Sequence, residues 1–78
     1  MNAIGLWTIY DHPADYPEHW VVRMAYVSDQ GVSCAASCEL FRDVQQARDY
    51  IQQQAPGASC LQHAGEDPDP VIYEVWWP

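Results

Sequence analysis

Most of the side chains that could do chemistry lie in one short segment, between Trp7 and Trp20. This segment reads W-T-I-Y-D-H-P-A-D-Y-P-E-H-W, and it holds three carboxylates and two histidines, namely Asp11, Asp15, Glu18, His12 and His19. Carboxylates and imidazoles transfer protons and bind metal ions. These residue types could therefore form a catalytic loop or a metal-binding loop.

A catalytic role needs such groups to be held rigidly in a cleft with shifted pKa values. The loop has nine residues, Asp11 to His19, and belongs to a chain of 78 residues, so it offers little cleft. Neither a nucleophile nor a glycine-rich phosphate loop accompanies it. Pro13 and Pro17 would instead stiffen a connection between strands, and Asp11 would form an Asx turn. We therefore expect no catalytic residue and a protein that is not an enzyme.

A second chemically capable set comprises three thiols and an imidazole, the donors of a structural zinc site: Cys34, Cys38, Cys60 and His63. If residues 34–38 form a strand, the Cα atoms of Cys34 and Cys38 lie about 13 Å apart. Thiolates that share one zinc ion lie within roughly 4 Å of each other. We therefore expect free thiols that pack as small buried hydrophobic side chains, without metal or cofactor, and keep a small zinc-binding protein as a third possible function.

Two opposite charges interrupt apolar strands. Arg23 and Glu74 each lie near the middle of a predicted strand. If the two strands are neighbours, the side chains can oppose each other as a cross-strand ion pair that fixes the register of the strands. The alternative is that each residue marks a solvated face.

The elements that position these residues are predicted from periodicity. β-branched and aromatic residues in alternation indicate strands at 4–10, 20–27 and 71–77, a further strand near 32–41, and a short extended segment at 58–63. The turn Ser28-Asp29-Gln30-Gly31 predicts that the second and third strands form a hairpin.

A single helix follows the third strand. Asp43 can cap it, the apolar residues Val44, Ala47, Tyr50 and Ile51 recur at helical spacing, and Pro56-Gly57 ends it. Residues 1–78 are thus predicted to be one small α+β domain, with an antiparallel or mixed sheet of 4–5 strands and one helix packed on one face. The second face is predicted to be partly open or covered by aromatic side chains.

The charge is strongly negative. Eleven carboxylates face three arginines and no lysine, which gives a formal net charge of −8. Proteins bind nucleic acids and anionic membrane surfaces through Lys and Arg, so we expect neither direct nucleic-acid binding nor membrane binding. The absence of lysine also excludes Schiff-base and P-loop chemistry.

The first residues, M-N-A-I-G-L-W-T, lack the features of a signal peptide. We therefore expect a cytoplasmic protein, in which the three cysteines stay reduced.

Two segments together are similar to a group of small uncharacterised bacterial and phage proteins. The start, Y-D-H-P-A-D-Y-P…W-V-V-R, and the end, E-D-P-D-P-V-I-Y-E-V-W, resemble the Y-D-H-P-x-D-x-P and D-P-V-I-x-E-V-W patterns of that group, over about a third of the chain. The resemblance carries no catalytic residue. It implies that the loop at 11–17 and the turn at 67–70 belong to one structural unit.

These observations favour a small acidic interaction protein that is not an enzyme and binds another protein, and the charge permits a partner with a basic surface. If the first and last strands run side by side, six carboxylates gather at one end of the sheet as candidate interaction residues: Asp11, Asp15, Glu18, Glu66, Asp67 and Asp69. The alternative function is a phage-encoded inhibitor of host nucleic-acid machinery, of the anti-CRISPR or DNA-mimic type, which the acidic composition also permits.

Overall fold

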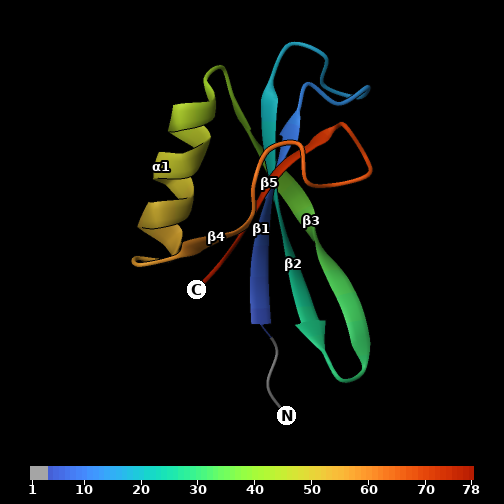
Figure 1. Ribbon diagram of the computed structural model, residues 1–78, viewed down its shortest axis with the longest axis vertical. Helices are drawn as coiled ribbons and strands as arrows, with labels where there is room; N and C mark the ends of the chain where they lie inside the picture. Colours follow the sequence, from blue (N-terminus) through green and yellow to red (C-terminus); the bar gives the residue numbers. More distant parts are fainter. Residues whose placement is uncertain (1–3) are drawn as a thin grey trace.

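The computed structural model describes residues 4–78, apart from the side chains of residues 35–37. Five strands and one helix follow one another as β1 (Ile4–Asp11), β2 (Trp20–Ser28), β3 (Gly31–Phe41), α1 (Val44–Gln54), β4 (Ser59–Gln62) and β5 (Ile72–Trp77). The strands form one antiparallel sheet, and α1 packs on one of its faces (Figure 1). The predicted α+β fold class is confirmed.

The first strand of the chain lies at the centre of the sheet. The strand order is β3-β2-β1-β5-β4, so β1 pairs with both β2 and β5. The predicted hairpin of β2 and β3 is confirmed, and its turn is held by a hydrogen bond from the Gln30 backbone N–H to the Ser28 hydroxyl, 3.2 Å long. Gly31 completes this turn with a φ of 120°, a backbone conformation that favours glycine.

The core lies between α1 and the face of the sheet that β1 and β2 present to it. Ile9 and Val22 pair across β1 and β2, and Ile9 is fully buried together with Ile51 of the helix. Burying one such side chain stabilises the fold by about 1.5–3 kcal/mol. The apolar stripe predicted from helical spacing therefore forms the contact between helix and sheet.

Both ends of α1 follow from local chemistry. Asp43 caps the first turn, with its Oδ1 accepting a 2.7 Å hydrogen bond from the Gln45 backbone N–H. The helix ends at Gln54, where the Ala55 N–H still reaches the Ile51 carbonyl, because Pro56 cannot donate the next hydrogen bond.

The opposite face of the sheet is covered in part. Val21 and Val75 are buried, whereas Ile4, Val32 and Leu40 are between 40 % and 67 % exposed. The prediction of a partly open second face is therefore confirmed.

The predicted cross-strand pair of Arg23 and Glu74 is wrong. β1 lies between β2 and β5, so Arg23 pairs in register with Thr8, while Glu74 pairs with Ile9. Consecutive residues of a strand point to opposite faces. Arg23 and Glu74 therefore lie on opposite faces of the sheet and cannot form an ion pair.

Candidate functional site

The loop that connects β1 to β2 is built from two tight turns. The Tyr16 N–H donates to the Pro13 carbonyl at 2.9 Å, and the His19 N–H donates to the Tyr16 carbonyl at 3.2 Å. His12 starts the loop with a positive φ of 48°, and its Nδ1 is hydrogen-bonded to the Asp11 carboxylate. Asp11 thus contacts a neighbouring side chain, and the Asx turn predicted for it does not form.

Aromatic rings fix the loop to the sheet. The Trp20 ring lies between the rings of His12 and Tyr73, with centroid distances of 5.1 Å and 4.8 Å and edge-on geometry at both contacts. Aromatic pairs of this geometry contribute about 0.5–1.5 kcal/mol each beyond the area they bury. The start of β2 is therefore joined both to the β1–β2 loop and to β5.

The acidic turn before β5 uses its carboxylates to hold its own backbone. Asp67 accepts a 2.9 Å hydrogen bond from the Asp69 N–H and a 2.7 Å bond from the Gln62 side-chain amide. Asp69 in turn accepts from the Val71 N–H at 3.0 Å, and Glu66 accepts from the His63 N–H. Side chains that bond the backbone two residues on form Asx turns, which explains the placement of both aspartates.

The β1–β2 loop and the acidic turn meet at one end of the sheet. The Asp11 N–H, at the end of β1, donates a 2.7 Å hydrogen bond to the Val71 carbonyl, just before β5 (Figure 1). Arg23 is also close, since its guanidinium lies 3.3 Å from the Asp15 carboxylate. The two segments that the sequence resemblance assigns to one structural unit are therefore neighbours.

We call the six carboxylates of this region the acidic sheet end: Asp11, Asp15, Glu18, Glu66, Asp67 and Asp69. Four of them are exposed, and Asp11 and Asp67 are half-buried. Burial is the main cause that raises the pKa of the Tyr10 hydroxyl; Arg23 opposes this shift, and the charges of Cys34, Asp69 and Asp67 add smaller contributions to it. Fixed negative charge thus accumulates beside the ends of β1 and β5.

A buried ion pair connects α1 to β5. Glu74 is only 7 % exposed, and its carboxylate accepts two hydrogen bonds from the Arg48 guanidinium, at 3.0 Å and 2.8 Å, and one from the Trp76 indole, at 3.1 Å. Burial alone would raise the pKa of Glu74, but the hydrogen bonds from Arg48 and Trp76 outweigh it, and the pKa lies below its ordinary value of 4.5. The same pairing raises the pKa of Arg48.

Sequence reasoning assigned no partner to Arg48 and so missed this pair. The signal that could have found it is the spacing of Val44, Ala47, Arg48 and Ile51, which is the i, i+3, i+4, i+7 pattern of a core-facing stripe. A carboxylate on the facing strand is the partner that a charge in this stripe requires.

The zinc alternative is excluded by the strand order. Cys34 and Cys38 lie on β3, at one edge of the sheet, whereas Cys60 lies on β4, at the opposite edge. Four strand spacings of about 4.8 Å separate these edges by roughly 19 Å. Cys34, Cys38, Cys60 and His63 therefore cannot share one ion.

The three thiols are free, but they are not the buried side chains that the sequence predicts. Cys34 is exposed, and Cys38 and Cys60 are half-buried. Their strands form the two edges of the sheet, where fewer neighbours cover them. Within residues 4–78 as described, no cluster of three or more His, Cys, Asp and Glu side chains is arranged to hold a metal ion.

Comparison of the chain with protein-family models, with curated proteins and with solved structures found no match. The resemblance to small bacterial and phage proteins therefore stays a prediction. No helix in the described part of the chain is long and apolar enough to cross a membrane.

Proposed function

We propose that this protein is an interaction module, not an enzyme, and that it binds a basic protein partner through the acidic sheet end. The observation that carries the proposal is the junction of the β1–β2 loop and the acidic turn, which places Asp11 beside Val71. Two acidic segments separated by more than forty residues of sequence contribute to one surface as a result.

Electrostatics favours a basic partner. The chain carries a net charge of −8, and Arg23 offsets one of the six charges of the acidic sheet end through its hydrogen bond to Asp15. A surface of one sign raises the association rate of an oppositely charged partner and repels others, and added salt weakens this steering.

The rigidity of the acidic turn also supports a recognition role. Asp67 and Asp69 are held by hydrogen bonds to backbone N–H groups, so their side chains keep fixed positions. Charged groups that are ordered before binding lose less conformational entropy when a partner docks. The hydrogen bonds that shape the turn therefore also prepare its carboxylates for an ionic contact.

The test uses a poly-lysine peptide as a basic probe and amide NMR spectra as the readout. The largest shift changes should fall on residues 11–20 and 63–72, and the peptide should bind more weakly as ionic strength rises. Asp67→Asn with Asp69→Asn removes two charges but keeps an amide oxygen to accept each turn hydrogen bond, and this variant should bind more weakly.

The matched control is Asp29→Asn with Asp49→Asn, which removes two charges elsewhere, in the β2–β3 turn and on the exposed side of α1. If this control weakens peptide binding as much as the Asp67 and Asp69 variant does, only net charge matters and the acidic sheet end is not a binding site. Shift changes spread evenly over the molecule would lead to the same conclusion.

A further inference from the structure

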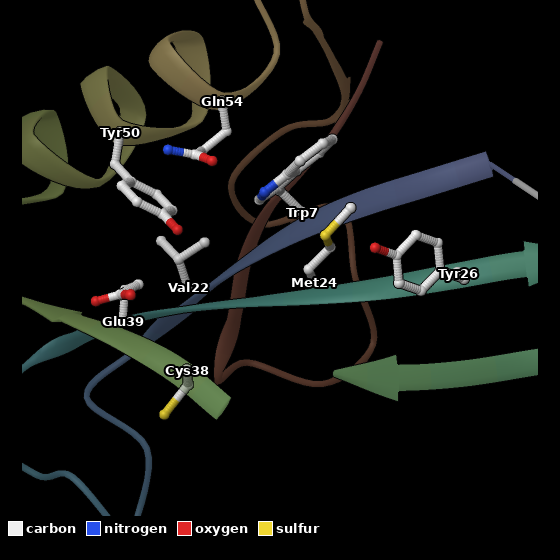
Figure 2. A pocket seen from close by; sticks show the side chains of 8 residues that line it. All are labelled: Trp7, Val22, Met24, Tyr26, Cys38, Glu39, Tyr50 and Gln54. Carbon is white, nitrogen blue, oxygen red and sulfur yellow. The ribbon is translucent and has the colours of Figure 1, made fainter. Parts of the chain in front are cut away.

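A second feature, distinct from the acidic sheet end, is a pocket on the helix-covered side of the sheet. It has a volume of about 410 Å³ and lies where β1, β2 and β3 meet the last turns of α1 (Figure 2). Small-molecule sites in proteins typically have volumes of about 300–1,000 Å³. The pocket is therefore large enough for a small organic ligand.

The floor of the pocket is apolar and polarisable. The Trp7 ring, the Met24 thioether and the Tyr26 ring lie next to one another along β1 and β2 (Figure 2). Tyr26 is 46 % exposed, so its ring is open to a ligand. Gly5 leaves room for the Met24 methyl group in this position, because a Cβ at residue 5 would lie 2.8 Å from the methyl carbon and the Met24 side chain would have to shift.

The helix provides a second wall, and β3 provides a charge. Tyr50 and Gln54 extend from α1 toward the sheet, while Glu39 extends from β3 beside Val22 (Figure 2). Among the described residues that line the pocket, Glu39 is the one carboxylate and none is basic. A ligand that fills this space thus meets three aromatic rings and one negative charge.

The three aromatic rings and the single carboxylate favour one class of ligand, organic cations. Aromatic faces attract cations, most effectively weakly hydrated ones such as quaternary ammonium groups. A neutral apolar ligand would remove water from Glu39 without replacing its interaction, which is unfavourable. Metal ions such as Ca²⁺ require several oxygen ligands, whereas the pocket offers one carboxylate.

We propose that this pocket binds a small molecule that carries a quaternary or tertiary ammonium group on a short apolar body. The ammonium group lies between the Tyr50 ring and the Glu39 carboxylate, and the apolar body contacts Trp7 and Met24 (Figure 2). This assignment does not depend on the acidic sheet end, because none of the six carboxylates of that surface lines the pocket.

The experiment compares choline with 3,3-dimethylbutan-1-ol, its neutral carbon isostere, in NMR titrations of the wild-type chain. Choline should shift the Trp7 indole and Met24 methyl resonances, and the neutral alcohol should bind at least about threefold more weakly. Benzyltrimethylammonium should bind more tightly than tetramethylammonium, because its ring adds apolar contact.

Pairs of variants test separately how the negative charge and the aromatic face contribute to the affinity for choline. Glu39→Gln should weaken choline binding by about threefold to tenfold and leave the alcohol unaffected, whereas Glu18→Gln, which removes a carboxylate of the acidic sheet end, should leave both unchanged. Tyr50→Phe should retain choline binding, and Tyr50→Leu should weaken it because the aromatic face is lost. Glu39 is exposed, and Phe and Leu keep an apolar side chain in place of the half-buried Tyr50, so these variants should fold.

Several results would overturn the proposal. These are equal affinity for choline and its neutral isostere, an unchanged affinity in Glu39→Gln, or an absence of shifts at Trp7 and Met24. Tighter binding of N-acetyl-arginine amide than of choline would overturn it too, by assigning the pocket to a protein side chain. Shifts confined to residues 11–20 and 63–72 would place the cation at the acidic sheet end instead.

Discussion

At the scale of single residues, the ionisation of Glu74 is coupled to the fold. Its carboxylate is buried, yet Arg48 and Trp76 supply three hydrogen bonds to the charged form. The pKa of Glu74 in the folded chain therefore lies below its ordinary value of 4.5. Glu74 contributes stability above that value, and the contribution is lost as the pH falls through the folded pKa.

We expect Glu74→Gln to lower the free energy of unfolding at neutral pH by about 1–3 kcal/mol, since the ionic hydrogen bonds are lost and Arg48 keeps access to water. The difference from the wild type should begin to shrink below about pH 4.5, the ordinary pKa at which the unfolded chain is protonated, and should be lost as the pH falls through the lower pKa of the folded carboxylate. Urea denaturation between about pH 3 and pH 7 measures both effects. Stability curves that stay parallel across this range would show that Glu74 is not coupled to folding.

At the scale of elements, the ion pair joins α1 to β5, two segments that are not adjacent in sequence. Arg48 also lies over the Tyr73 ring, with 6.0 Å between the guanidinium carbon and the ring centroid. The helix is thus held to the sheet by polar contacts at its border as well as by Ala47 and Ile51 in the core.

A double-mutant cycle tests which arginine is the partner of Glu74. Arg48→Met and Glu74→Gln should be coupled by about 1–2 kcal/mol, because the pair is bidentate and partly buried. Arg23→Met and Glu74→Gln should be additive within about 0.5 kcal/mol, because these residues lie on opposite faces of the sheet. Coupling of Arg23 to Glu74 in urea denaturation would contradict the observed strand order.

The sequence predicted the elements, the fold class and the β2–β3 hairpin, but not the full order of the strands. Alternating apolar residues and the cap at Asp43 depend on neighbours along the chain, so each strand and the helix began and ended within about two residues of the predicted bounds. Strand order depends on contacts between distant segments. Nothing near Arg23 or Glu74 in the sequence indicates that β1 lies between their strands, and the predicted pair was wrong for that reason.

The candidate site divides in the same way. The joint sequence pattern indicates that the loop after Asp11 and the turn before Val71 belong together. The carboxylates of the two segments were expected to meet only if the first and last strands are adjacent. The pocket beside Tyr26 gave no comparable signal, because its walls come from β1, β2, β3 and α1. Such a hollow exists only once these elements are packed.

At the scale of the whole molecule, repulsion among the negative charges destabilises the compact folded state. A net charge of −8 is confined to a molecule whose radius of gyration is 12.1 Å. The screening length is about 30 Å at 0.01 M salt and about 10 Å at 0.1 M. At low salt, therefore, every carboxylate repels every other across the molecule, whereas at higher salt only near neighbours interact.

We expect the free energy of unfolding to rise by on the order of 1 kcal/mol when NaCl is increased from about 0.01 M to about 0.1 M, because self-repulsion is screened. Urea denaturation at pH 7 measures the change. The Asp29→Asn, Asp49→Asn variant, which carries two fewer negative charges, should gain less. Stability that falls with added salt would show that the surface ion pair of Arg23 with Asp15 outweighs the repulsion.

The central place of β1 has a consequence for the order in which the chain becomes structured during synthesis. β1, β2 and β3 are consecutive in sequence and adjacent in the sheet, so they can pair as soon as they leave the ribosome. The second edge of β1 must wait for β5, which follows the other four strands in the sequence, and β4 joins the sheet through β5. During that interval β1 presents a row of unpaired backbone groups, an edge at which newly made chains can associate with one another.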